Sequence, residues 1–315
     1  MPVGQFAVVV FALIVVAEIA GGVALQRLVG LKTNRERLFF WVWYASLFSL
    51  FWMAVEGQIS MFLFFAWLGF YGFQSRGKEG WSGAALALGL VKPQYILLPL
   101  ALLLAHRQWR ALQAFAAIAG GLAVISIAVS GPEVLIEYPR FLVESTTWEE
   151  QGITPQTMFG WNSLITSITG DHSPSMALVG PLILLTLAGA VMAWRGPWAP
   201  QSPRFLLQIG VTILAALLIS PHLYVQDLCL LTLVIGLGTV HSLKTTGGYG
   251  VWPWVAVAAW VGQLYGLELQ ELLRVNVMTP SMAALGVHLL LKLRNREAAE
   301  IVEADHTRIV VAPAA

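Results

Sequence analysis

Long apolar runs recur along almost the whole chain and constrain its fold more than any other feature. Each run has about the length that a helix needs to cross roughly 30 Å of hydrocarbon. The nine runs lie at 6–25, 38–55, 59–74, 111–130, 176–194, 205–220, 224–241, 251–267 and 278–291. Charged residues make up 11% of the chain, whereas a soluble domain carries about 25%. The pattern predicts an all-α integral membrane protein with about nine full spans.

The segment 81–105 is also apolar, but Lys92 and Pro93 interrupt it. Proline lacks a backbone N–H and clashes with the preceding turn, so a helix is expected to stop there. The segment either crosses the membrane once or forms two half-helices that enter and leave on the same side. Because cytoplasmic loops are enriched in Lys and Arg, the basic residues between the spans decide between the two.

The half-helix hairpin at 81–105 places the following cations together on the cytoplasmic side: Arg27, Lys32, Arg35, Arg37, Arg76, Lys78, Arg107, Arg110, Arg195, Arg204, Lys244, Lys292, Arg294 and Arg296. A single crossing would move every cation after residue 105 to the outside. We therefore predict the hairpin, with Met1 and the acidic loop 131–175 outside. Residues 1–294 form one polytopic domain, and the polar segment 295–315 is predicted to be a disordered cytoplasmic tail.

Lys92 is the most costly polar residue of the apolar segments. A charge at the bilayer centre costs about 2.5–3.5 kcal/mol, so a protonated lysine needs a wet cavity or an anion. Broken helices at membrane depth are tolerated where they line such a cavity. One interpretation is an anion site for the phosphate of a lipid carrier. The other is a lysine that reaches the outer interface beside a structural proline.

The remaining polar candidates lie near span ends. Gln58 follows Glu56-Gly57 at the mouth of a span, where a helix-end turn explains it equally well. Asn162 and Ser163 open an apolar run after the acidic loop, so they are either site residues or helix caps. The turn between two spans holds His222, Tyr224 and Asp227, which we expect near the level of Lys92. Glu18, within the first span, is expected to pair inside the bundle.

Other chemistries have little support in the sequence. No His, Cys, Asp or Glu grouping has the spacing of metal ligands, and no glycine-rich loop of the nucleotide-binding kind occurs. The net charge is +1, and no basic cluster alternates with aromatic residues. We expect no metal, no cofactor and no nucleic-acid partner.

The stretch "EGQISMFLFFAWLGFYGFQSRGKEGWSGAALALGLVKPQYILLPLALLLAHRQWRAL" (56–112) resembles the core of glycosyltransferase family 87. The likeness rests on Gly57-Gln58, the basic turn at 76–78, Lys92-Pro93 and the basic end at 107–110. Farther on, Asn162-Ser163-Leu164 and Ser220-Pro221-His222 follow in the family's order. The likeness runs from about residue 5 to 290.

This resemblance implies a GT-C-like membrane mannosyltransferase of the plasma membrane, active on the extracytoplasmic face. Its donor would be a polyprenyl-phosphate-sugar, and its acceptor a lipid-linked or cell-envelope glycan. The resemblance also implies residue roles. Lys92 and His222 would bind the donor phosphate, and Asp227 would orient His222. The residues that would contact sugar or acceptor are Gln58, Gln94, Asn162, Ser163, Tyr224 and Asp227.

The sequence departs from the family at its start. Such enzymes carry a carboxylate, the general base, in the first extracytoplasmic loop, and the family's position for this base lies upstream of Met1. The catalytic base is therefore unknown, and Asp227, Glu56 and the acidic loop are substitutes. We expect a truncated reading frame, a chain that needs a partner, or a divergent member, with weak or no transferase activity.

Two further functions stay open. A secondary transporter or flippase would also use a broken helix with an ionisable residue near mid-membrane. Against it, the second half of the chain shows no corresponding break. A non-catalytic membrane subunit would need no general base at all.

Overall fold

The computed structural model describes residues 3–144, 158–170 and 175–310, and within these ranges the regular secondary structure is helical, with turns and loops between the helices. The only β-type pairing in the described ranges is an isolated bridge between Phe159 and Leu223. The α-helices are α1 (Val3–Val29), α2 (Asn34–Ala45), α3 (Phe48–Glu56), α4 (Met61–Gln74), α5 (Glu79–Leu86), α6 (Leu97–Ala105), α7 (Trp109–Ser130), α8 (Val134–Glu144), α9 (Trp161–Thr169), α10 (Met176–Ala193), α11 (Pro203–Ile219), α12 (Cys229–Thr246), α13 (Trp252–Leu273) and α14 (Met278–Val310). Short 3-10 helices are η1 (Ala87–Val91), η2 (Pro93–Tyr95) and η6 (Val225–Leu228).

Four helical stretches are long and apolar enough to cross a membrane: 5–29, 109–130, 176–193 and 225–246. A fifth is formed if α2 and α3, which meet at an angle of 48°, count as one bent span. The helices α4 and α11 are apolar but shorter. The prediction of an all-α, multi-pass membrane protein is confirmed. The count of nine full spans goes beyond these four to five helices and stays a prediction.

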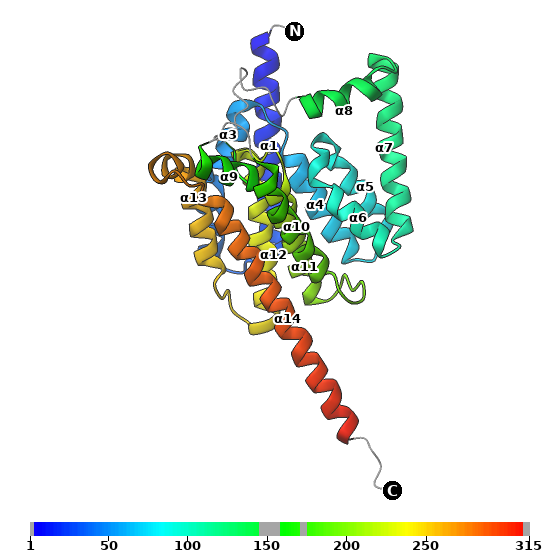
Figure 1. Cartoon of the computed structure of the whole chain (residues 1–315), viewed down its shortest axis with the longest axis vertical. Coiled ribbons are helices and arrows are strands. Elements are labelled where there is room, and N and C mark those ends of the chain that lie inside the picture. The colour runs from blue at the N-terminus through cyan, green and yellow to red at the C-terminus, as the bar shows by residue number, and fades with distance from the viewer. Residues whose placement is uncertain (1–2, 145–157, 171–174, 311–315) are drawn as a thin grey trace.

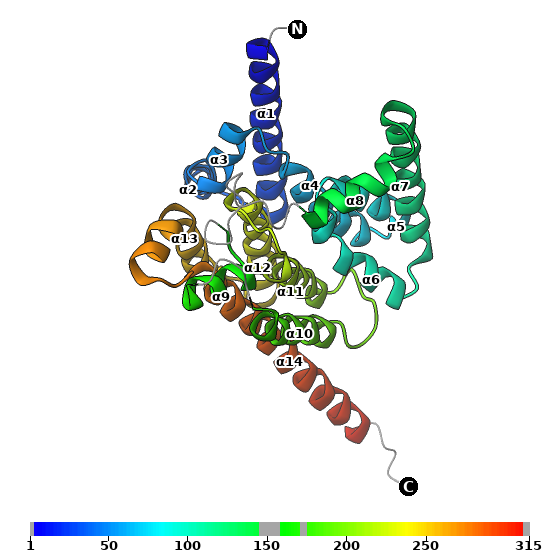
Figure 2. The same ribbon diagram turned by 45° about the horizontal axis from the view of Figure 1, so that its top comes forward.

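The core of the bundle is formed by α11 and α12. Both are buried along nearly their whole length, and Figure 2 shows them enclosed by α1, α4, α10, α13 and α14. By contrast, α7 lies at the edge of the bundle (Figure 1) and buries only Ala111. An apolar helix exposed on almost every face suits contact with lipid rather than with water.

The broken segment 81–105 turns at Lys92, whose backbone leaves the helical region at φ −143° and ψ 79°. A residue before proline is disfavoured in the α conformation, which explains why the break falls there. On the near side of the turn, α5 and η1 run back along α4: a Cβ on Gly69 would lie 2.7 Å from Ala85, and one on Gly89 would lie 3.6 Å from Ala66. The turn itself therefore lies next to the start of α4.

The two ends of this segment lie together. Gly83 in α5 is so close to α7 that a Cβ would meet the carbonyl oxygen of Ala111. Trp198 lies at this end too, because its Nε1 donates to Gln74 Oε1 at the end of α4 at 3.3 Å while its ring packs on that of His106, just after α6, at 5.0 Å. The chain thus enters and leaves the segment at one end of the bundle, as the distribution of Lys and Arg favoured.

The C-terminal segment begins within α14, whose helical bounds extend to Val310. This stretch is rich in Ala, Glu and Arg, which are strong helix formers despite their polarity. The disordered cytoplasmic tail at 295–315 stays a prediction.

Several predictions concern residues outside the described ranges. Met1, predicted to lie on the outer side of the membrane, belongs to the segment 1–2, which the structure does not describe. The same holds for 311–315 of the tail and for 145–157 and 171–174 of the loop 131–175. The remaining residues of that loop include α8 and α9. The side on which Met1 lies therefore stays a prediction.

Candidate functional site

Four polar side chains from three separate parts of the chain meet at one point, and we refer to them as the Lys92–Asp227 cluster. Ser60 directly precedes α4, Lys92 and Tyr95 belong to the turn of the broken segment, and Asp227 lies in η6. Asp227 is fully buried, whereas 17% of the Lys92 side chain is exposed. The cluster therefore has one face that is open to a ligand, and Lys92 supplies it.

Asp227 is hydrogen-bonded through both carboxylate oxygens. Its Oδ1 accepts from Lys92 Nζ at 2.5 Å and from Ser60 Oγ at 2.6 Å. Its Oδ2 lies 2.9 Å from the hydroxyl of Tyr95. A buried carboxylate is tolerated only when it is paired and hydrogen-bonded, and these three donors meet that requirement.

Lys92 keeps donor capacity after these contacts. Its ammonium group carries three N–H donors, and the bonds to Asp227 and to Ser60 Oγ at 3.1 Å use two of them. The third is available for an acceptor on the exposed side. Since the ion pair with Asp227 is neutral as a unit, an anion at this point would be held by a hydrogen bond and local polarity rather than by a full net charge.

His222 lies next to the cluster but is connected to it through its backbone. Its carbonyl oxygen is 3.1 Å from the Tyr95 hydroxyl, while the hydrogen bonds of Asp227 go to Lys92, Ser60 and Tyr95 rather than to the imidazole. The Nε2 atom of His222 is buried and has no hydrogen-bond partner in the described ranges. Burial lowers the pKa of His222, so this imidazole is neutral at pH 7 in the protein without a bound ligand.

Tyr224 and Gln58, two further residues that the sequence suggested, lie at the edge of the Lys92–Asp227 cluster. Tyr224 is half-buried at the start of η6. The carboxylates of Asp227 and of the exposed Glu56 are both close enough to interact electrostatically with its hydroxyl. Gln58 is half-buried and follows Gly57, which adopts a left-handed φ of 66°. The N–H of Gln58 donates to Met53 O at 2.9 Å. This turn ends helix α3, which agrees with the interpretation of Gln58 as part of a helix-end turn.

Gln94 occupies the single turn η2, half-buried between Lys92 and Tyr95 in sequence. Within the described part of the chain, the structure gives no hydrogen bond for its side chain. Its position at the tip of the broken segment is compatible with a contact to a ligand at Lys92.

Asn162 and Ser163 belong to a different group of contacts. Ser163 is buried, donates to Met158 O at 2.6 Å and accepts from Asn276 Nδ2 at 2.9 Å. Gly160, with φ 90°, occupies the N-cap of α9, so the prediction that Asn162 or Ser163 caps this helix is wrong. The polar network instead fastens α9 to the start of α14.

A short link connects this group to the cluster. The Phe159 N–H donates to Leu223 O at 2.7 Å, which places the start of α9 along the segment that leads to Asp227. In the part of the chain that the structure describes, no hydrogen bond joins Asn162 or Ser163 to the cluster.

Sequence reasoning missed Ser60 and Tyr95, because neither is ionised at neutral pH and both occur in apolar surroundings. Tyr95 stands three residues after Lys92 in the same break, and this proximity was the available signal. Glu18 was expected to pair within the bundle. Its carbonyl accepts from the Tyr44 hydroxyl at 3.0 Å, but its Oε1 is buried without a partner in the described ranges.

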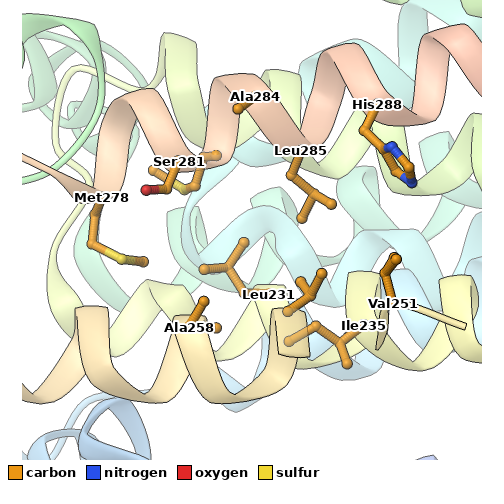
Figure 3. A pocket seen from close by; sticks show the side chains of 12 residues that line it. Leu231, Ile235, Val251, Ala258, Met278, Ser281, Ala284, Leu285 and His288 are labelled. Atoms are coloured by element: carbon orange, nitrogen blue, oxygen red, sulfur yellow. The ribbon is translucent and has the colours of Figure 1, made fainter. Parts of the chain in front are cut away.

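An apolar cavity of about 360 Å³ lies between α12, α13 and α14. Figure 3 shows Leu231 and Ile235 of α12 facing Leu285 and His288 of α14 across it. Its walls are almost entirely apolar and include no member of the Lys92–Asp227 cluster. This cavity could hold hydrocarbon but offers little that could orient a polar reaction.

Metal chemistry finds no candidate ligands in the ranges 3–144, 158–170 and 175–310, where no group of three or more His, Cys, Asp or Glu residues could hold an ion. What the cluster can offer chemically is one lysine N–H beside a neutral imidazole, because the Tyr95 hydroxyl is buried against Asp227. Such groups suit the recognition of an anionic oxygen.

Comparison with known proteins gives one match. Residues 1–221 match the sequence profile of the family described as Glycosyltransferase family 87. No curated protein matches the chain, and no solved structure does. The matched residues include Ser60, Lys92 and Tyr95, and they end just before His222 and Asp227.

Proposed function

The chain belongs to glycosyltransferase family 87, and from this premise we propose a specific reaction. It transfers a hexose, mannose, from a polyprenyl-phosphate donor to a lipid-linked or cell-envelope glycan. The reaction takes place on the extracytoplasmic face of the plasma membrane, in a GT-C-like bundle of nine spans and the half-helix hairpin. The placement of Lys92 is the observation that carries the proposal.

Lys92 is held where a donor phosphate would need a cation. The break at Pro93 stops the helix, and Asp227 and Ser60 fix the ammonium from the buried side. As the sugar departs, negative charge develops on the phosphate that leaves. A donor group fixed beforehand in a medium of low dielectric stabilises that charge without reorganisation.

His222 is proposed as the second phosphate ligand. Its Nε2 has no hydrogen-bond partner among the described residues, and its imidazole is neutral, so it is a hydrogen-bonding group in the protein without bound sugar donor. A phosphate beside it would favour the imidazolium, because an opposite charge nearby stabilises the charged form. Gln58, Gln94, Asn162 and Tyr224 are proposed to contact sugar or acceptor hydroxyls.

Asp227 fits a positioning role better than that of general base. Its carboxylate is fully buried and both oxygens accept hydrogen bonds, so an acceptor hydroxyl could reach it only after these bonds break. Glu56 is exposed beside Tyr224 and is the better placed of the described acids. In the acidic loop, Glu149 and Glu150 lie outside the described ranges, and the base stays unassigned.

Donor binding is the sharpest test, because it does not depend on which residue is the base. Protein reconstituted in vesicles with labelled polyprenyl-phosphate-mannose is expected to bind the donor saturably. The double substitution Lys92→Met and Asp227→Asn, which removes the ion pair as a unit, should abolish this binding. Any transfer that the unmodified protein catalyses should fall by at least about 100-fold. Lys78→Met removes a cation at the opposite end of α4 and should change neither donor binding nor transfer.

Two results would overturn the proposal: an absence of saturable binding, or binding that the double substitution leaves unchanged. Movement of the donor between leaflets without transfer would instead favour the flippase alternative. The structure gives that alternative little support, since the second bent element, α2–α3, lies in the same half of the chain as the broken segment.

A further inference from the structure

A second cavity, which two arginines border, lies at the other end of α4, away from the Lys92–Asp227 cluster. It measures about 430 Å³ and lies between the last turns of α1 and α4. Ser60 precedes the first residue of α4, and Arg76 follows its last turn. At 1.5 Å per residue the helix separates the two places by roughly 20 Å. The cavity is therefore a separate site, and nothing in the proposed reaction uses it.

Small residues create the space. Gly69 and Gly72 of α4 line the cavity together with Ala24 of α1. Gly69 allows close packing elsewhere, since a Cβ there would lie 2.7 Å from Ala85. The apolar part of the wall, which includes Leu28 and Leu68, resembles a surface for hydrocarbon rather than for water.

Two arginines give the cavity its charge. Arg27 comes from α1 and Arg76 from the end of α4, and no carboxylate is among the lining residues. Arg76 Nη1 donates to Gly72 O at 2.6 Å, and Ser75 contributes a hydroxyl to the lining. A guanidinium has five N–H donors in a planar fork, so most of those on Arg76 are left for a second acceptor.

A purely structural role accounts for part of this arrangement. Cations near helix C-termini interact favourably with the helix dipole, and both arginines lie near such ends. That role explains their sign, but it does not explain why both border one cavity that has apolar walls and no carboxylate in its lining. Two guanidinium groups that border one cavity with apolar walls match an amphipathic anion, namely a phosphate attached to hydrocarbon.

We propose that this cavity binds the phosphate group of an anionic phospholipid, with Arg27 and Arg76 as the headgroup ligands. The cavity lies at the end of the bundle where Lys and Arg concentrate, which the sequence places on the cytoplasmic side. Basic pockets between membrane helices on that side meet a leaflet that contains anionic lipids. The inference is independent of the donor and of the transfer reaction.

Native mass spectrometry of the detergent-purified protein tests the proposal, with phosphatidylglycerol titrated against phosphatidylcholine. The unmodified protein should bind phosphatidylglycerol saturably and in preference. Each arginine near a membrane surface is expected to contribute about fivefold, so the double substitution Arg27→Gln and Arg76→Gln should weaken binding about 25-fold. Lys78→Gln, an exposed cation two residues from Arg76 that does not line the cavity, is the matched control.

Arg27→Lys with Arg76→Lys keeps the charge and controls for folding, and it should retain most of the binding. The proposal is overturned if the double Gln substitution changes nothing, or if Lys78→Gln weakens binding equally. A third arm uses inorganic phosphate alone. If free phosphate binds with the same dependence on both arginines, the site is one for a soluble anion, and the assignment to a lipid is wrong.

Discussion

At the scale of single residues, the Lys92–Asp227 pair shows how a costly lysine becomes tolerable. Taking either charge out of water is expensive, and their attraction repays that cost only if other hydrogen bonds satisfy the remaining donors and acceptors. Ser60 and Tyr95 supply those bonds to Asp227. The pair is therefore a unit, and its two members cannot be interpreted separately by mutation.

Lys92→Met should leave the Asp227 carboxylate buried and uncompensated, at a cost of about 3–5 kcal/mol. Adding Asp227→Asn to the same chain should recover most of that loss, because no buried charge remains. The midpoint of thermal unfolding in detergent measures both effects. Equal midpoints for the single and double variants would show that the ion pair does not stabilise the fold in this way.

The pH dependence of donor affinity should follow His222. Burial lowers its pKa in the donor-free protein, and a bound phosphate raises it, so binding takes up a proton. Donor affinity should then increase as the pH falls from about 8 to about 6, by at most about tenfold per pH unit. Titration of labelled donor at several pH values measures this slope.

His222→Gln should flatten that profile while it keeps a neutral donor group in place. His106→Gln is the matched control, because His106 packs on Trp198 at the far end of the broken segment and its pKa is also lowered by burial. A slope that persists in His222→Gln would assign the proton to another group.

At the scale of elements, the broken segment depends on glycines at close approaches. Gly83 and Gly80 both lie in α5, yet a Cβ on Gly83 would meet the backbone of Ala111, whereas one on Gly80 would meet no atom within 4 Å. The difference identifies α5–α7 packing as the contact that keeps the two ends of the segment together. Backbone atoms cannot move aside as a flexible side chain can.

Gly83→Ala should destabilise the protein by about 1–3 kcal/mol through overpacking. Gly80→Ala should be neutral or stabilise it by up to about 1 kcal/mol, since alanine is the better helix former. Because helix propensity changes equally in the two variants, the difference between their unfolding midpoints isolates the packing term. Identical midpoints would contradict the close approach of α5 and α7.

At the scale of the whole molecule, the turn at Lys92 determines which helix ends share a side. Figure 1 shows α7 rising from the end of α6 to α8, at the same end of the bundle as the N-terminus, while α14 extends away from the opposite end. Residues 78 and 107 therefore share one end of the bundle, and residue 140 lies at the other.

Single cysteines introduced as Lys78→Cys, Arg107→Cys and Arg140→Cys can be tested in intact cells with a maleimide that does not cross membranes. Position 140 should be labelled, and positions 78 and 107 should be protected until the membrane is opened. The native Cys229 is buried and should contribute little background. Labelling of 78 and 107 from opposite sides would show that the segment crosses the membrane.

The sequence by itself determined the class of the protein and the position of the break. Apolar length and low charge require a helical membrane protein, and a proline after Lys92 ends a helix whatever surrounds it. The resemblance to the family likewise depended on ordered local motifs. These properties are local, so they can be inferred without knowing which helices touch.

Only the tertiary structure decided the partners. Lys92 and Asp227 are 135 residues apart, and no spacing in the chain indicates that Asp227 faces the lysine rather than His222. Ser60 and Tyr95 became visible only when three segments were brought together, because uncharged polar groups are common at helix ends. Ser163 conversely belongs to the α9–α14 contact. Hydrogen-bond partners depend on three-dimensional packing, which the one-dimensional pattern constrains but does not specify.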